Sequence, residues 1–597
     1  MTDQGANGKK AWAPWLTGEV ALYGLILALA LVVRLSGLEM RIMDVPEAEQ
    51  AWQSWLLVQG KAPPGQYSPL LLTGQALIFL LFGAGDGTAR LLPALAGSAL
   101  AVLPFLLRRR LGRVGSLVAA VGLALSPTLV YASRYGDGAM LLAASALAVV
   151  ALWLAYQESG RPRYLYAIAV TGALGCLSDP RVVSVLIVLA LIWAVWRLLS
   201  RQTQPEAQER ALPAADAPDL PSKATVSWKR MGLFFGGTLL LGATGFMFNP
   251  GGLGVWADFP SAWARHLAPV VNGQPWHYPL LALALYEPFV LFLGVIGAVT
   301  AALRRDRIAV LGCMAMGLLI AALIAGGRGA GDVALLCAPL GLLAGRTVED
   351  LVQSWWKGAR WWREGLFVLV VLVILVYVGL QAAFYARSLY LNMPQAAQFL
   401  WFWLLALALL VVLFGFSLSW FGWDVTWRTG AAVLVVACLL VSFAAMAGLN
   451  FRHANDVREL HVMSAPDIGV RDLLRVMADL SYRQRGYPTS IAVTVEAKLG
   501  SLFPWYLRNW EQVTFVEELT PEVTTPVVVS SVEQANPTLG DRYMGQDFVT
   551  RTWWQPTQLA ANDRWSWWLY RNSVQKPVPI QKAILWIKAQ DQVAGTP

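Results

Sequence analysis

Apolar segments of roughly 20 residues, the length that crosses the hydrocarbon core of a bilayer, recur between residues 18 and 449. Short polar segments, many of them containing Arg or Lys, separate them. Because no short apolar region with a small-residue cleavage site precedes the first segment, we expect that segment to remain as an anchor. The pattern predicts thirteen transmembrane helices, at residues 18–38, 89–107, 113–132, 138–157, 163–178, 182–199, 231–248, 281–303, 308–326, 331–345, 364–386, 397–419 and 429–449.

One further apolar stretch, residues 69–83, is too short to cross a membrane. It has 15 residues, a length more typical of interfacial or re-entrant segments. Basic residues collect on the cytoplasmic side of membranes, so the tail 1–17 and the turn "RRRLGR" (108–113) are both expected inside. An even number of crossings must then separate them. Residues 69–83 are therefore predicted to form an interfacial helix within a long first external loop, 39–88.

The chain after residue 449 has the composition of a soluble domain. Residues 467–483 show helical periodicity, and three later segments rich in β-branched residues predict strands. An odd number of crossings places this region outside the cell, so we predict an extracytoplasmic α/β domain over 450–597. The predicted strands are 490–495, 512–516 and 525–531, and the apolar face of the helix carries Ile468, Leu473, Leu474, Met477 and Leu480.

The composition supports a multi-pass protein of the plasma membrane. Hydrophobic residues make up 57% of the chain and charged residues only 14%, against about 25% in soluble domains. The net charge of +9 belongs to the membrane part, which fits basic cytoplasmic loops and argues against nucleic-acid binding. The linker 200–230, rich in Pro, Ala and charge, is expected to be a disordered cytoplasmic loop. The four cysteines lie in apolar segments without metal-ligand spacing, so we expect them to be buried small residues.

The predicted external loops carry polar groups suited to chemistry at the membrane surface. The stretch "RIMDVPEAEQAW" (41–52) opens the first loop with three carboxylates, and "SRYGDG" in the second loop adds another. Carboxylates can act as general bases or hold a divalent cation, for which Mg²⁺ or Mn²⁺ is the expectation in this protein. Arg and His side chains bind phosphate, and Trp and Tyr side chains stack on sugars. The candidate catalytic residues are Asp44, Glu47 and Asp137, with Glu47 and Asp137 also the candidate cation ligands, and the candidate donor-binding residues are Tyr67, Arg134, Arg265, His266, Trp276, His277, Tyr278 and Glu287.

The order of these features resembles the GT-C superfamily of glycosyltransferases that use lipid-linked donors, and within it the family 39 relatives. These include protein O-mannosyltransferases and the aminoarabinose transferases of lipid A. The segments "PEAEQAWQSWLLVQGKAPPGQYSPLLLTGQALIFLLFG", "QPWHYPLLALALYEPF" and "FPWYLRNW" are similar to bacterial and archaeal "flippase activity-associated" membrane proteins. The resemblance spans nearly the full length and implies a GT-C-like helical membrane domain over 18–449.

The resemblance also implies roles for particular residues. In the superfamily an Asp-Glu pair in the first loop supplies the catalytic carboxylate near the donor phosphate, and here that place reads "DVPEA" (44–48). In one register Pro46 replaces the Asp, and in the other Glu47 does, so the pair is broken in both. Asp137 matches the second acid of the superfamily. Ser68 stands where some relatives carry a lysine, which removes one phosphate contact.

Two functions remain open from the sequence. The first is inverting transfer of a hexose from a polyprenyl-phosphate donor to a protein, lipid or glycan acceptor at the extracytoplasmic face. Glu47 or Asp44 would be the base, with Glu47 opening a short helix and pointing towards Asp137 while Glu49 faces solvent. The second is a non-catalytic accessory protein that binds lipid-linked sugars and assists their flipping or glycan assembly. An ion-coupled transporter is poorly supported, because ionisable residues are nearly absent from the centres of the spans.

Overall fold

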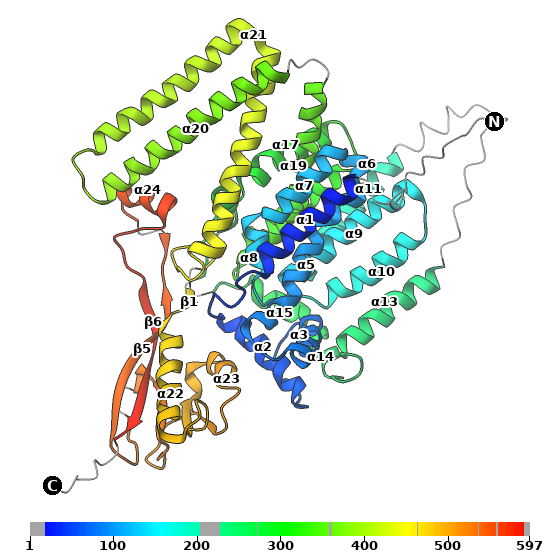
Figure 1. Ribbon diagram of the computed structural model, residues 1–597. Coiled ribbons are helices and arrows are strands. Elements are labelled where there is room, and N and C mark those ends of the chain that lie inside the picture. Colours follow the sequence, from blue (N-terminus) through cyan, green and yellow to red (C-terminus); the bar gives the residue numbers. More distant parts are fainter. Residues whose placement is uncertain are drawn as a thin grey trace, which may run out of the picture.

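The computed structural model describes residues 18–202, 227–270, 273–356, 361–462, 464–534, 537–556 and 559–589. The tail 1–17 and most of the linker 200–230 lie outside these ranges, so the predictions made for them are not tested. A helical membrane domain makes up most of the molecule, and a smaller domain with a sheet lies at one end of it (Figure 1).

Most of the helices are packed into one bundle (Figure 1). Its most buried long helix is α19, whose apolar stretch lies almost entirely inside the protein. The helices of the bundle are α1 (Gly18–Leu35), α5 (Leu91–Val102), η1 (Leu103–Leu107), α6 (Arg108–Leu111), α7 (Arg113–Leu125), α8 (Pro127–Ser133), α9 (Ala139–Ser159), α10 (Arg163–Cys176), α11 (Val182–Gln202), α13 (Trp228–Ala243), α16 (Tyr278–Tyr286), η2 (Phe289–Leu293), α17 (Gly294–Leu303), α18 (Ala309–Ile324) and α19 (Ala330–Trp356).

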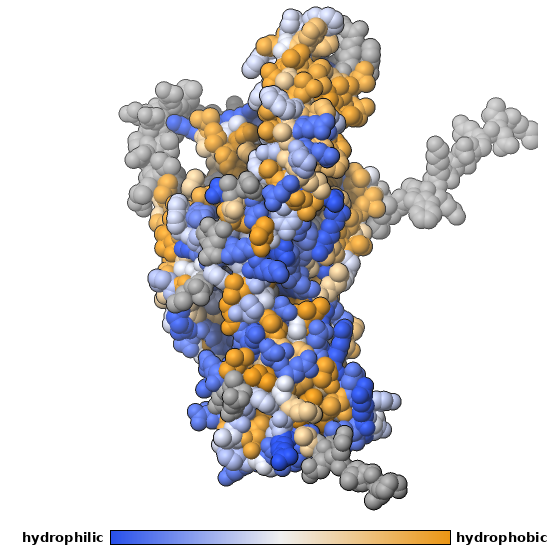
Figure 2. All heavy atoms as spheres, turned by 90° about the vertical axis from the view of Figure 1, so that its left-hand side faces the viewer, coloured by the Kyte–Doolittle hydropathy of each residue, from blue (hydrophilic) through white to orange (hydrophobic). Residues whose placement is uncertain are grey.

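Two longer helices follow the bundle, α20 (Trp361–Tyr390) and α21 (Ala396–Ala447). The first half of α21 packs against α20, and the pair forms an arm beside the bundle (Figure 1). Gly422, with φ of +79°, breaks α21 into two helices and turns the second half back towards the bundle. Apolar side chains cover most of this arm, whereas the domain below it has a mixed surface (Figure 2).

The predicted spans fall on helices, with 397–419 and 429–449 on the two halves of α21. Two of them are broken: 113–132 covers α7 and α8, bent by 55°, and 281–303 covers α16, η2 and α17, bent by 104° between Tyr286 and Phe289. By length and hydropathy, six helices among the described residues qualify as spans, or eight when two bent pairs are included. Several others, such as α18 with 16 residues, are shorter than the usual span. The multi-pass helical architecture is therefore confirmed, and the number thirteen stays a prediction.

The predicted first loop folds into helices at one end of the bundle. Asp44 caps the N-terminus of α2 (Val45–Val58), and Ser68 caps α3 (Pro69–Phe82), which is the short helix expected at 69–83. Both helices have proline in the first turn, where a missing N–H costs nothing. The remaining short helices near this end are α4 (Asp86–Ala89), α14 (Gly252–Ala257) and α15 (Phe259–Leu267).

The C-terminal domain has a six-stranded sheet of order β1-β5-β6-β4-β2-β3. Strand β2 pairs in parallel with β3 and β4, as expected for alternating strands and helices, and the other pairs are antiparallel. The elements are β1 (Ser464–Pro466), α22 (Gly469–Arg485), β2 (Val493–Glu496), η4 (Ala497–Leu499), α23 (Leu502–Tyr506), β3 (Val513–Val516), β4 (Val527–Ser531), η5 (Val532–Gln534), β5 (Tyr543–Trp553), α24 (Ala561–Tyr570) and β6 (Val578–Lys588), with η3 (Gly448–Arg452) joining the domain to α21.

The predicted helix and three strands of this domain match α22, β2, β3 and β4. Leu473 and Met477 are buried against the sheet, but Ile468 precedes the helix and is 67% exposed, so its place on the apolar face was wrong. The sequence analysis missed β5 and β6, which form a long antiparallel ribbon (Figure 1).

Hydrogen bonds join this domain to the first loop. The hydroxyl of Tyr506 accepts from the Met43 amide at 3.0 Å and donates to Asp86 at 3.1 Å, and the Trp505 indole donates to Asp86 at 2.9 Å. Arg508 donates to the carbonyl of Ala84 at 2.6 Å. Segments 39–88 and 451–597 therefore meet at one end of the bundle, and the assignment of that end to the outside stays a prediction.

Candidate functional site

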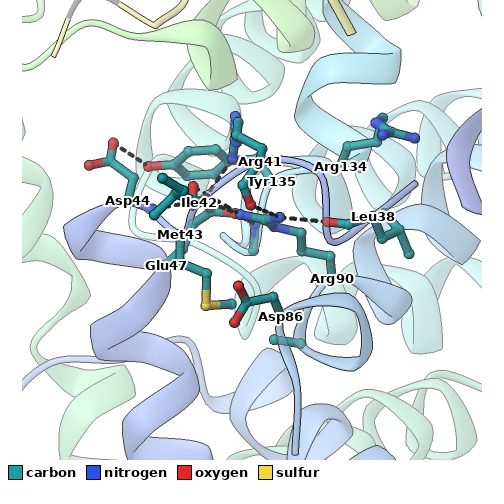
Figure 3. Close-up of polar contacts among 12 residues, drawn as sticks. Leu38, Arg41, Ile42, Met43, Asp44, Glu47, Asp86, Arg90, Arg134 and Tyr135 are labelled. Atoms are coloured by element: carbon teal, nitrogen blue, oxygen red, sulfur yellow. Dashed lines mark hydrogen bonds and ion pairs between the residues drawn. The ribbon is translucent and has the colours of Figure 1, made fainter. Parts of the chain in front are cut away.

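Glu47 lies at the centre of a buried ion-pair network between the first and second loops (Figure 3). Its Oε1 accepts from Arg90 Nε at 2.9 Å and from the Gly136 amide at 2.6 Å. Its Oε2 accepts from Arg90 Nη2 at 3.0 Å and from Arg41 Nη2 at 2.7 Å. The Asp44 amide also donates to Oε2, completing the capping box that starts α2. Both carboxylate oxygens are thus fully engaged.

This environment fixes the charge of Glu47. Burial by itself would raise the pKa, but Arg41, Arg90 and the Gly136 amide outweigh burial and lower the pKa to about 2. A carboxylate that holds a proton so weakly, with no exposed surface, is a poor general base. In this structure Glu47 fixes the two loops to each other.

Asp44, the N-cap of α2 three residues before Glu47, has a different environment. It is partly exposed, and its Oδ2 accepts a hydrogen bond from the Tyr135 hydroxyl at 3.2 Å (Figure 3). Burial of the group and the nearby charge of Glu47 raise the pKa of Asp44 above its ordinary value. Asp44 is therefore a stronger base than an ordinary aspartate and reaches the surface of the site.

The second loop places Asp137 beside a different cation. Asp137 Oδ2 lies 3.1 Å from Arg181 Nη2, and Asp179 Oδ1 lies 2.9 Å from Arg181 Nε. Burial and the charge of Asp179 raise the pKa of Asp137 to about 6, although Arg181 opposes them. The Gly136 amide, rather than Asp137, contacts Glu47. Glu47 and Asp137 therefore come from the same pair of loops without meeting.

The two carboxylates do not fit a shared cation, because each already has a guanidinium partner. Among the described residues no group of three or more His, Cys, Asp or Glu side chains is arranged to hold a metal ion. A requirement for Mg²⁺ or Mn²⁺ stays a prediction from the sequence.

Arg134 is not available to a lipid phosphate in this arrangement. It is 8% exposed, and its guanidinium donates to the carbonyls of Val33, Arg34, Ser36 and Gly37 at the end of α1. Its role here is to hold the chain where it leaves the first helix.

The fourth loop contributes more accessible groups. Arg265 on α15 is exposed and contacts Gln66 of the first loop at 2.5 Å. His266 contacts Asp332 at 3.3 Å, and Trp276 is 65% exposed and lies edge-on to His277. Arg265 therefore lies beside the first loop, and its exposed guanidinium is accessible to a ligand.

The other three predicted residues are buried. Tyr67 accepts from the Asn249 amide at 2.8 Å, and the Tyr278 hydroxyl lies 2.7 Å from His461 Nδ1. Glu287 accepts a hydrogen bond from Ser126, the residue that caps the N-terminus of α8. The predicted residues therefore do not form one site: Asp44 and Glu47 lie together, Asp137 pairs with Arg181, and Glu287 is bound to Ser126.

The sequence analysis also did not single out several residues that complete these sites, among them Arg41, Arg90, Tyr135, Arg181 and His461. Arg41 stands within the stretch of three carboxylates, where a cation close to so many acids is a usable signal. Arg90 stands at the boundary of the second predicted span and Arg181 in a short loop, and nothing in their local sequence points to partners 43 and 44 residues away.

Comparisons with known proteins agree with this architecture. Residues 66–207 match the family model described as dolichyl-phosphate-mannose-protein mannosyltransferase. The fold is similar to ArnT from Cupriavidus metallidurans bound to undecaprenyl phosphate, at 16% identity and a TM-score of 0.50, covering 88% of this chain and 96% of that one. The apo ArnT structure gives 18% identity, 83% and 86% coverage and a TM-score of 0.49.

An archaeal structure is also similar, the Archaeoglobus fulgidus oligosaccharyltransferase tethered with an acceptor peptide. It has 12% identity, covers 88% of this chain and 70% of that chain, and has a TM-score of 0.44. No curated protein matches the chain in sequence. The resemblance to GT-C membrane glycosyltransferases is confirmed by the family match and the shared fold.

Proposed function

We propose that this protein is a GT-C-type membrane glycosyltransferase that moves a hexose from a polyprenyl-phosphate donor to an acceptor at the extracytoplasmic face. The fold supports this class, and the similar ArnT structure is described as bound to undecaprenyl phosphate. The observation that carries the proposal is Asp44, a partly exposed carboxylate with a raised pKa beside the fixed Glu47 network.

The geometry favours Asp44 over Glu47 as the base. The acceptor hydroxyl gives its proton to Asp44 while its oxygen attacks the anomeric carbon of the donor sugar. The bond from that carbon to the phosphate oxygen breaks, and polyprenyl phosphate leaves with the electron pair. One displacement of this kind inverts the anomeric centre. Tyr135, which donates to Asp44, holds the carboxylate in position, and Arg265 offers its exposed charge to the phosphate.

A transfer assay tests this assignment. The purified protein in proteoliposomes is given a panel of radiolabelled polyprenyl-phosphate hexoses and membrane extract as acceptor, with and without Mg²⁺ or Mn²⁺. Asp44→Asn should lower turnover by about 10²-fold or more, the usual effect of losing a general base. Glu49→Gln is the matched control, because Glu49 lies exposed on the same helix. Undiminished turnover in Asp44→Asn contradicts the assignment.

A second function has its own support. Pro46 stands at one of the two positions expected for the superfamily's acid, and the neighbouring Glu47 is engaged by Arg41 and Arg90. A protein that binds lipid-linked sugars without transferring them would keep the network and lose the base. Donor binding by the purified protein without any transfer, from every donor tested, would favour this accessory role.

A further inference from the structure

A cavity of about 320 Å³ lies between α7, η2 and the second half of α21. Its volume is within the range of small-molecule sites in proteins. Two side chains at its rim, Leu440 and Phe443, are 54% and 50% exposed, so the cavity communicates with the apolar surroundings of the membrane domain. The lining is apolar except for Ser126, Glu287 and Ser442.

Glu287 contributes a carboxyl group to the lining of this cavity, and the hydrogen bonding of that group is incomplete. Its side chain is fully buried in the break between α16 and η2. Oε1 accepts from the Ser126 hydroxyl at 2.6 Å and from the Thr128 amide at 2.8 Å. Within the described part of the chain, Oε2 has no hydrogen-bond partner. A buried polar atom without a partner costs about 1–3 kcal/mol, so a ligand that supplies the missing hydrogen bond gains from it.

We propose that this cavity binds a membrane amphiphile with a hydrocarbon chain and an uncharged hydroxyl head. The chain fills the space lined by Val121, Leu125, Val436 and Leu439. The hydroxyl meets Oε2 of Glu287, and it can pair with that oxygen in either protonation state because a hydroxyl both donates and accepts.

The same carboxyl selects against anionic heads. A phosphate or a fatty-acid carboxylate placed beside Glu287 would bring two acids together in a low-dielectric site. Of the residues that the structure describes, no Arg, Lys or His side chain lines the cavity to compensate. The ligand therefore differs from a polyprenyl phosphate, and the proposal does not depend on sugar transfer.

Photolabelling of the full-length protein in lipid nanodiscs tests the site. The probe is a long-chain fatty alcohol carrying a diazirine on its chain, and the matched anionic probe is the corresponding fatty acid. Labelled peptides are located by mass spectrometry. We expect saturable labelling of the 436–443 segment by the alcohol, competed by unlabelled alcohol, and at least about fivefold less by the acid.

Two variants separate the cavity from the general lipid surface. Leu440→Trp fills the mouth and should abolish saturable labelling, whereas Val441→Trp, an exposed neighbour that does not line the cavity, should leave it unchanged. Glu287→Met should weaken the apparent affinity by about 2- to 10-fold, as one lost hydrogen bond predicts, and Glu287→Gln should keep most of it. Size-exclusion profiles identify any variant that fails to fold.

Equal labelling of the two tryptophan variants, or equal labelling by alcohol and acid, overturns the proposal. Loss of labelling in Glu287→Gln as severe as in Glu287→Met also contradicts it, since Gln retains hydrogen-bonding atoms at the same place. A wild type that shows only non-saturable labelling excludes the site.

Discussion

Replacing Glu47 with Gln should destabilise the folded protein rather than remove a proton acceptor. The pKa of Glu47 is lowered from its ordinary value of 4.5 to about 2. At 1.36 kcal/mol per unit, the ionised carboxylate contributes about 3 kcal/mol to stability at neutral pH. Loss of one partner of a buried ion pair typically costs about 3–5 kcal/mol, because the remaining charge is left without compensation. Here the fully buried Arg90 would be left so.

The sign of the pH dependence follows from the lowered pKa. The contribution is complete above about pH 4.5 and is lost as the pH falls through about 2. In detergent, equilibrium unfolding at pH 7 should therefore show a loss of about 3 kcal/mol for Glu47→Gln. Lowering the pH should destabilise the wild type more than the variant. Glu49→Gln, at an exposed position of the same helix, should change stability by less than about 0.5 kcal/mol.

A double variant sharpens the test. Replacing Glu47 with Leu and Arg90 with Met together should give a more stable protein than Glu47→Gln, because the fully buried Arg90 is then no longer left without its partner. Arg41 loses Glu47 in both variants, so its contribution cancels in the comparison. The reasoning is refuted if Glu47→Gln unfolds like the wild type and yet loses sugar transfer, since Glu47 would then act as the base.

Three further outcomes are expected. Burial raises the pKa of Asp137 to about 6. The contribution of Asp137 to stability is therefore complete below about pH 3.8 and is lost as the pH rises through about 6. Asp137→Asn should remove that decline from unfolding curves measured across this range. Tyr506→Phe removes two hydrogen bonds between the C-terminal domain and the first loop and should speed limited proteolysis of that domain, whereas Tyr482→Phe, at an exposed position, should not; equal rates would contradict the docking role. Lys61→Cys and Tyr487→Cys, both exposed and introduced into a cysteine-free background, should react with a membrane-impermeant maleimide on intact cells, and labelling only after lysis would reverse the predicted topology.

The helical architecture could be predicted from the sequence, because the length of an apolar segment is a local property of the chain. The helix at 69–83 could be predicted from its length and from charge parity, and α3 occupies residues 69–82. Helix α22 was visible because its apolar residues follow the helical period and bury one face, and the strands β2 and β4 because they are short β-branched runs, buried at every position.

The missing elements depend on partners distant in sequence. Strand β5 is half exposed along most of its length and contains Gly545, Asp547 and Arg551, so it lacks a continuous β-branched run. Its stability comes from pairing with β6, about 35 residues later.

In the candidate site, too, the local signals could be predicted and the contacts between distant residues could not. Asp44 and Glu47 stood out as acids at a predicted membrane surface, but their roles are set by the groups around them. Arg90, 43 residues away, and the Gly136 amide, 89 residues away, make Glu47 a fixed anion. Arg134 likewise appeared free in sequence and is occupied by backbone carbonyls at the end of α1.

The docking of Tyr506 on the first loop has a consequence for biosynthesis. Met43 leaves the ribosome early, and its partner Tyr506 follows 463 residues later, after the whole helical domain has been made. Throughout that interval the first loop, which carries Asp44, lacks its contacts with the C-terminal domain. A chain that ends before α23, through premature termination or proteolysis, would insert its helices and still leave this loop open. The uncovered first loop therefore distinguishes an unfinished molecule from a complete one.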